Sequence, residues 1–293
     1  MHRDAPPLWA GLDPQEHELQ YNPQAAFPDF NASQAERATA NEQARAALTA
    51  IRDVPYGDHP LRRLDIYPAE RRGEAPAPVH VFLHGGYWRA QDKENFAFVA
   101  GALVPLGITT VIINYELCPA STLDGVVDSA IAAARWIRGH IGEHGGDASA
   151  LVLSGHSAGA HLAAEIFAHN WAEEGIAPDF VGGAILISGI YDPTPAIATT
   201  VNAQLALDDT IARRHNVEIR SPLMRSRVAI LAGSREPWHW IDQSFRYAHH
   251  LHRHGLEPEV HVMPGWGHFD IIRQYLEPES PIMRLARHYA GQP

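Results

Sequence analysis

The chain has 293 residues, 45% of them hydrophobic, and a formal net charge of −11 with histidine neutral. No run of Lys or Arg exceeds two residues, which argues against nucleic acid and anionic membranes as partners, because both bind basic faces. Cys118 is the only cysteine, so no internal disulfide can form and a reducing compartment is expected.

The sequence shows no pattern typical of a signal peptide or of a membrane-spanning helix. The first seven residues carry Asp4, Pro6 and Pro7, where a signal peptide would need an apolar segment. The most apolar window, residues 97–115, is interrupted by Pro105 and Gly107 and is too short to span a bilayer. We therefore predict a cytoplasmic protein with no membrane partner.

Residues 1–50 differ in composition from the remainder. Five prolines fall within the first thirty positions, which predicts a mostly irregular segment there. Residues 32–51 are rich in alanine with interspersed Glu, Gln and Arg, which predicts a helix. We expect residues 1–50 to form an arm and helix that pack on a main domain of residues 51–293 and cover a site.

Strand and helix patterns alternate along the main domain. Residues 61–67 alternate polar and apolar side chains, as a half-buried edge strand does. More continuously apolar runs, typical of inner parallel strands, lie at 79–83, 109–114, 151–153, 183–187, 228–232 and 260–263. This alternation predicts an α/β fold, a mostly parallel sheet of about eight strands with helices on both faces. Residues 193–226, helical over 203–213, are expected to form a small helical cap over a pocket.

The segment Gly155-His156-Ser157-Ala158-Gly159 lies between a strand pattern (150–154) and a helix pattern (160–167). A serine bracketed by glycines at a strand-to-helix turn is typical of a nucleophile elbow, in which the serine hydroxyl is exposed. A G-x-S-x-G match alone is weak, because glycine and serine are common in turns. The flanking elements make Ser157 the candidate nucleophile, and an incidental serine in a loop is the alternative.

A serine nucleophile needs a base and a group that orients the base. Because the carboxyl ends of parallel strands share one edge of the sheet, both groups are expected in the loops after later strands. His268 follows the last strand and is the candidate base. Glu236 follows the strand at 228–232, in the chain order serine, acid, histidine, and is the candidate acid. Asp192 and Asp242 are alternative acids, the latter also being a candidate helix N-cap.

The turn His84-Gly85-Gly86-Tyr87-Trp88 follows another strand and can bring backbone N–H groups close to a substrate. We predict that the N–H groups of Gly86, Tyr87 and Ala158 form the oxyanion hole that acyl transfer requires. Aromatic residues near these loops predict a pocket for a substrate with an aromatic or apolar portion. The predicted substrate-binding residues are Tyr87, Trp88, His156, Tyr191, Trp238, Trp240 and Phe269. Among the histidines between 249 and 254, His250 and His254 stand four apart on a predicted helix, a spacing that could bind a metal. No third ligand is evident nearby and the segment lies at an exposed helix end, so we predict a solvated face and no metal site.

These motifs resemble the α/β-hydrolase superfamily and, within it, the kynurenine formamidase (arylformamidase) group and related bacterial esterases. The resemblance covers roughly residues 19–275 and includes Tyr21-Asn22-Pro23, Ser188-Gly189-Ile190-Tyr191-Asp192 and Gln243-Ser244 besides the motifs above. It implies Ser157 as nucleophile, an acid at the position of Glu236, His268 as base, the oxyanion hole given above, and no metal or cofactor. The animal formamidases have aspartate where this chain has Glu236, which bears on the choice of substrate.

The sequence thus predicts a serine hydrolase that cleaves a small ester or amide through an acyl-serine. Hydrolysis of an aryl formamide is implied by the resemblance alone, and a carboxylesterase acting on short acyl esters would use the same residues. A hydrolase fold that binds a ligand without catalysis is a remote alternative, because such proteins usually lack one member of the triad. The sequence does not decide between a monomer and a homodimer.

Overall fold

The computed structural model describes residues 8–28, 30–70 and 75–292. It contains one eight-stranded sheet in the order β1-β2-β4-β3-β5-β6-β7-β8, in which β1 and β2 run antiparallel to their neighbours and the others are parallel. The strands are β1 (Ile51–Pro55), β2 (Arg63–Tyr67), β3 (Ala77–Leu83), β4 (Thr109–Ile113), β5 (Gly146–His156), β6 (Val181–Ile187), β7 (Arg227–Gly233) and β8 (Glu259–Met263). The predicted fold class, a mostly parallel sheet in an α/β architecture, is confirmed.

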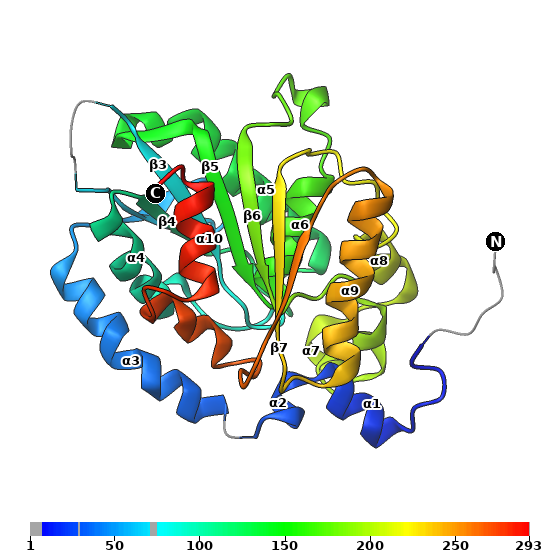
Figure 1. The fold of residues 1–293 in the computed structure, drawn as a ribbon. Helices are drawn as coiled ribbons and strands as arrows, with labels where there is room; N and C mark the ends of the chain where they lie inside the picture. The colour runs from blue at the N-terminus through cyan, green and yellow to red at the C-terminus, as the bar shows by residue number, and fades with distance from the viewer. Residues whose placement is uncertain (1–7, 29, 71–74, 293) are drawn as a thin grey trace.

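Helices cover both faces of this sheet. They are α1 (Pro14–Tyr21), α2 (Pro23–Ala26), α3 (Phe30–Ala47), α4 (Ala97–Leu103), α5 (Leu123–His140), α6 (Ala158–Ala168), α7 (Asn202–Leu205), α8 (Asp209–Arg214), α9 (Trp238–Arg253) and α10 (Pro281–Tyr289). The buried apolar residues fall into two clusters, one joining the sheet to α5, α6 and α9 and the other joining it to α4 and α10. Figure 1 shows α10 on the near face of the sheet, with α5 and α6 behind it. None of the helices in the described part of the chain has the length and apolar character needed to cross a bilayer.

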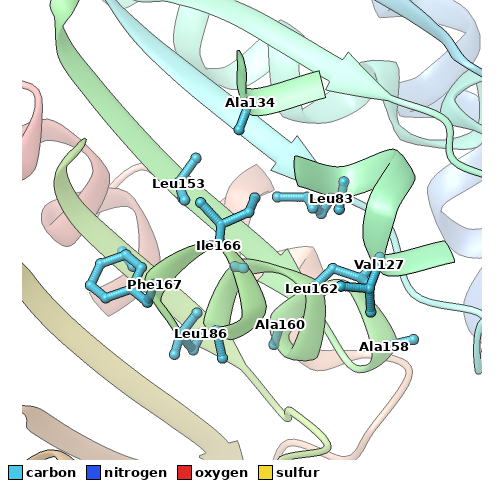
Figure 2. Packing of buried hydrophobic residues seen from close by; sticks show 14 of the residues in the cluster. Leu83, Val127, Ala134, Leu153, Ala158, Ala160, Leu162, Ile166, Phe167 and Leu186 are labelled. Carbon is cyan, nitrogen blue, oxygen red and sulfur yellow. The ribbon is translucent and has the colours of Figure 1, made fainter. Parts of the chain in front are cut away.

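The helix that follows Ser157 is buried among other elements of the protein. Residues 158–167 of α6 are all buried. Leu162 and Ile166 lie in the same cluster as Leu83 of β3, Leu153 of β5 and Val127 of α5 (Figure 2). Because a helix surrounded by close-packed side chains can shift only by opening cavities, the first turn of α6 is a fixed support for the serine that precedes it.

The predicted position of the edge strand is wrong. β2 pairs with β1 on one side and with β4 on the other, so β1 is the edge. β1 was missed because Arg52, Asp53 and Pro55 mask its pattern, and its side chains are mostly exposed, as an edge strand tolerates.

The prediction that the first thirty residues are mostly irregular is wrong between residues 14 and 26. Pro14 and Pro23 occupy the first positions of α1 and α2, where a missing N–H costs nothing and the fixed φ suits a helix. Asp13 caps α1 by accepting hydrogen bonds of 2.9 Å from the N–H groups of Gln15 and Glu16. The side chain of Asn22 caps α2. Pro6 and Pro7 lie outside the described residues.

The helix expected over 203–213 is interrupted. α7 ends at Leu205, Ala206 adopts a left-handed conformation with a φ of 51°, and α8 begins at Asp209. The side chain of Asp208 caps α8 by accepting a 2.8 Å hydrogen bond from the N–H of Ile211. Two short α-helices therefore stand where a single helix was predicted.

Candidate active site

Ser157 stands at the junction of β5 and α6 with a φ of 55° and a ψ of −118°. Its N–H donates a 2.8 Å hydrogen bond to the carbonyl of Ile187 in β6, which holds this strained conformation. The flanking glycines serve close approach: a Cβ on Gly155 would lie 2.2 Å from the carbonyl oxygen of Gly159. A Cβ on Gly159 would lie 2.0 Å from the carbonyl oxygen of Leu83. The sharp turn is therefore made by Ser157 itself, and the absence of a side chain on the two glycines lets strand and helix approach each other closely.

The structure brings together the three predicted catalytic residues, all of which are buried. His268 Nδ1 lies 2.6 Å from Glu236 Oε1, and His268 Nε2 lies 3.0 Å from Ser157 Oγ. Because a carboxylate accepts only, Nδ1 carries the proton of a neutral ring, and the lone pair on Nε2 faces the serine hydroxyl. This arrangement can remove a proton from Ser157 Oγ.

Both oxygens of Glu236 are occupied. Oε1 accepts from His268, while Oε2 accepts from the N–H of Gly233 at 2.7 Å and from the hydroxyl of Ser188 at 3.0 Å. The sequence pattern assigned Ser188 no role, whereas this contact makes it a support of the acid. The carboxylate is therefore fixed in position by the ends of strands β6 and β7.

The two alternative acids are engaged elsewhere. The side chain of Asp192 accepts from the N–H of Thr194 at 2.9 Å. Asp242 lies inside α9, whose N-cap is Pro237, and pairs with Arg246 at 2.8 Å. Among the contacts of the described residues, neither aspartate bonds to His268, so the geometry favours Glu236.

Three backbone N–H groups next to Ser157 have no acceptor within the described residues. They belong to Gly86, Tyr87 and Ala158, the residues predicted to form the oxyanion hole. Gly86 and Tyr87 both have positive φ, 121° and 53°, and both line the cavity that contains Ser157. Two of these residues line the cavity of Ser157 and the third directly follows Ser157 in the chain, so their free N–H groups are suited to hydrogen-bond a substrate oxygen.

The cavity at Ser157 opens to solvent, and the empty space inside it and at its mouth together amounts to about 630 Å³. Three predicted substrate-binding residues, Tyr87, His156 and Phe269, line it. Burial lowers the pKa of His156 well below its usual value, and the neighbouring His268 adds to this effect. His156 is therefore neutral, and its Nε2 donates a 2.7 Å hydrogen bond to the carbonyl of His268.

The other four predicted substrate-binding residues do not line this cavity. Trp240 packs edge-on against His268 with its ring centroid 4.9 Å away. Trp88, which has a φ of 57°, is fully buried in the core with its ring edge-on to His161. Tyr191 is buried and stacks on Tyr247, and Trp238 is 65% exposed at the start of α9. Sequence proximity to a catalytic loop did not determine which side of the loop each ring occupies.

The cavity is covered by the N-terminal helices. Its lining includes Pro23 and Gln24 of α2 and Phe30, Gln34 and Arg37 of α3, and no lining residue in the described part of the chain comes from 193–226. The expected cap over the pocket is therefore formed by residues that the sequence assigned to the arm. Figure 1 shows α1 and α2 crossing the end of the sheet at which β7 finishes.

Residues 80–270 match the α/β-hydrolase fold family. The chain belongs to this family. This hydrolase is 28% identical to kynurenine formamidase of Danio rerio, over 97% of this chain and 99% of that one. It is 30% identical to kynurenine formamidase of Salmo salar over 86% and 85% of the two chains.

Solved structures show the same fold. A protein from Silicibacter sp. TM1040 superposes on the hydrolase with a TM-score of 0.79 and 23% identity, over 91% of this chain and 98% of that one. An esterase from Pyrobaculum calidifontis superposes with a TM-score of 0.70 and 20% identity, over 95% and 97% of the two chains. The predicted resemblance to α/β-hydrolases and to kynurenine formamidases is confirmed.

Proposed function

We propose that Ser157, His268 and Glu236 form a catalytic triad that hydrolyses an aryl formamide or a closely related small amide or ester. The observation that carries this proposal is the chain of two hydrogen bonds, 3.0 Å from Ser157 Oγ to His268 Nε2 and 2.6 Å from His268 Nδ1 to Glu236 Oε1. This is the relation of nucleophile, base and orienting acid that serine hydrolysis requires.

The proposed reaction has two steps. Ser157 Oγ attacks the carbonyl carbon while His268 Nε2 takes the hydroxyl proton, and the developing oxyanion accepts hydrogen bonds from the free N–H groups of Gly86, Tyr87 and Ala158. Glu236 stabilises the imidazolium that results. His268 then protonates the leaving amine or alcohol as its bond to the carbonyl carbon breaks, which leaves the acyl-serine. In the second step His268 deprotonates a water molecule, which attacks the acyl-serine and releases the acid.

Similarity over nearly the whole chain to kynurenine formamidases supports an aryl formamide as substrate. Phe30 and Phe269, with ring centroids 5.5 Å apart, line the cavity and offer apolar contacts to an aryl group. The likeness to the Pyrobaculum esterase supports the second candidate, a carboxylesterase for short acyl groups, because the same triad would act on either carbonyl.

Kinetics separate the two candidates. We expect hydrolysis of N-formylkynurenine, and of p-nitrophenyl formate faster than the acetate and butyrate, with Ser157→Ala reducing kcat/KM by about 10⁴-fold or more. Circular dichroism should show Ser157→Ala to be folded. If Ser157→Ala keeps its activity, the proposed triad is wrong. If the protein hydrolyses the butyrate ester but no formamide, the triad stands and the protein is a carboxylesterase, not a formamidase.

A further inference from the structure

One face of α3 forms a wall of the cavity that contains Ser157. Phe30, Gln34 and Arg37 are spaced at i, i+4 and i+7, which places them on one side of a helix, and all three line the cavity. The stripe continues at Ala44, which is buried against α4. A helix that would ordinarily show an apolar stripe to the protein thus presents an amide and a cation at the site.

Arg37 is a buried cation without a counterion. It is 8% exposed, and its guanidinium makes no hydrogen bond or ion pair with a described residue; its Nε is buried and unpartnered. Its contacts are with the rings of Phe96 and Phe98, whose centroids lie 5.6 and 5.7 Å from the guanidinium carbon. The adjacent acid, Glu36, is instead paired with Arg273 at 2.5 Å.

The charge of Arg37 persists at neutral pH. Burial, with a smaller effect of the charge on Arg273, lowers the pKa of Arg37 to about 10, so the group is still protonated at pH 7. A buried cation left without a partner opposes folding, because its lost hydration is not replaced. Such a group is uncommon unless a ligand supplies the missing anion.

The remaining charge in the cavity has the same sign. Among the described lining residues only Arg37 and Arg89 carry a formal charge. Arg89 donates to the amide oxygens of Gln24 and Gln204, which orient the guanidinium without neutralising it. In a chain of net charge −11, a cavity whose charged lining residues, among those described, are both cations favours an anionic substrate over a neutral one.

We propose that Arg37 determines specificity by binding a carboxylate that the substrate carries beside its scissile ester or amide. The inference rests on the proposed function, since it places the carboxylate in the cavity of Ser157. A planar guanidinium that already stacks on Phe96 and Phe98 has its fork of N–H donors pre-oriented, which suits a carboxylate. Gln34, one turn earlier on the same face, offers amide hydrogens to the same group.

Two aryl acetates that differ only in charge test this role, namely 4-acetoxybenzoate and 4-acetoxybenzamide, alongside N-formylkynurenine and its α-carboxamide. We expect the unaltered protein to favour the anionic member of at least one pair by roughly 10- to 100-fold in kcat/KM, the range of a charge-assisted hydrogen bond. Arg37→Met should remove this preference by slowing only the anionic substrate, and Arg37→Lys should restore part of it. Arg45→Met is the matched control, because Arg45 lies on α3 outside the cavity and pairs with Glu94.

Binding to Ser157→Ala, measured by calorimetry with the same compounds, separates recognition from turnover. If neither pair is hydrolysed but Ser157→Ala binds the anionic member more tightly, the proposed function fails and the role of Arg37 stands. Removing an unpaired buried cation should not destabilise the protein, so we expect Arg37→Met to melt at or above the melting temperature of the unaltered protein. If Arg37→Met does not fold, Arg37→Gln takes its place in this measurement. Equal preference in the unaltered protein and in the Arg37 variants, in both turnover and binding, would overturn the inference.

Discussion

At the scale of single residues, the site depends on strained conformations that neighbouring strands hold. Ser157 and Ser188 both have positive φ, 55° and 50°, a conformation that costs a residue with a side chain about 1–3 kcal/mol. Ser188 follows β6, and its N–H donates a 2.7 Å hydrogen bond to the carbonyl of Leu231 in β7. This conformation directs its hydroxyl to Glu236 Oε2 and its carbonyl to the indole N–H of Trp240.

Replacing Ser188 by alanine should therefore weaken catalysis without removing the triad. We expect Ser188→Ala to lower kcat/KM by about tenfold, since Glu236 loses one of three donors and holds His268 less firmly. Ser244→Ala is the matched control, because Ser244 is also a buried serine and its hydroxyl bonds to no described residue. Steady-state kinetics of the two variants decide the matter, and an equal loss in both would speak against the role of Ser188.

At the scale of elements, the elbow requires β5, α6 and β3 to approach more closely than side chains allow. Gly159, in the first turn of α6, faces the carbonyl oxygen of Leu83, and α6 is fixed from its other sides by packing (Figure 2). The fold therefore has no room to accommodate a methyl group here by moving the helix.

Gly159→Ala is expected to destabilise the protein by about 1–3 kcal/mol or more and to abolish most activity, because α6 and Ser157 must shift together. Gly139→Ala provides the comparison: Gly139 lies in α5, and apart from its chain neighbours and the nearby backbone of its own helix, no described atom lies within 4 Å of the position that its methyl group would take. Alanine at this position should therefore stabilise the helix by about 0.5–1 kcal/mol. Urea denaturation measures both changes. A Gly159→Ala variant as stable and active as the unaltered protein would refute the close-approach explanation.

Regular patterns made the inner elements predictable from sequence. The apolar runs of β3, β4 and β7, and the glycine-bracketed serine between β5 and α6, each have a local signature. The chain order of the motifs also located His268 and Glu236 correctly at the carboxyl edge of the sheet, where the structure joins them to Ser157. The features that could not be predicted depend on tertiary contacts. The burial of Arg37 against Phe96 and the packing of Trp88 in the core have no signature in the local sequence.

At the scale of the whole molecule, the sheet also buries an ionisable group that does not line the cavity of Ser157. His80 of β3 is fully buried, and its Nε2 lies 2.6 Å from the hydroxyl of Ser154 and 3.3 Å from that of Tyr275. Burial lowers the pKa of His80 from 6.5 to about 3. The folded protein therefore holds this ring neutral under conditions in which the unfolded chain protonates it.

This difference predicts a pH-dependent stability. The contribution of neutral His80 to the free energy of unfolding is complete above pH 6.5. It is lost as the pH falls toward 3, because in this pH range the unfolded chain binds a proton that the folded protein does not. We expect His80→Gln to reduce the slope of unfolding free energy against pH between 4 and 6 by up to about 1.4 kcal/mol per pH unit. Urea denaturation at several pH values measures the slope, with His249→Gln at an exposed position as control. An unchanged slope in His80→Gln would contradict the burial argument.

Covalent labelling is the sharpest test of Ser157 as the nucleophile of this hydrolase. A fluorophosphonate probe should add once to the folded protein, and peptide mapping by mass spectrometry should locate the adduct on Ser157. Ser157→Ala should not react, and His268→Ala should react far more slowly because the serine keeps its proton. An adduct on another residue, or hydrolysis that continues after Ser157 is fully labelled, would show that Ser157 is not the nucleophile.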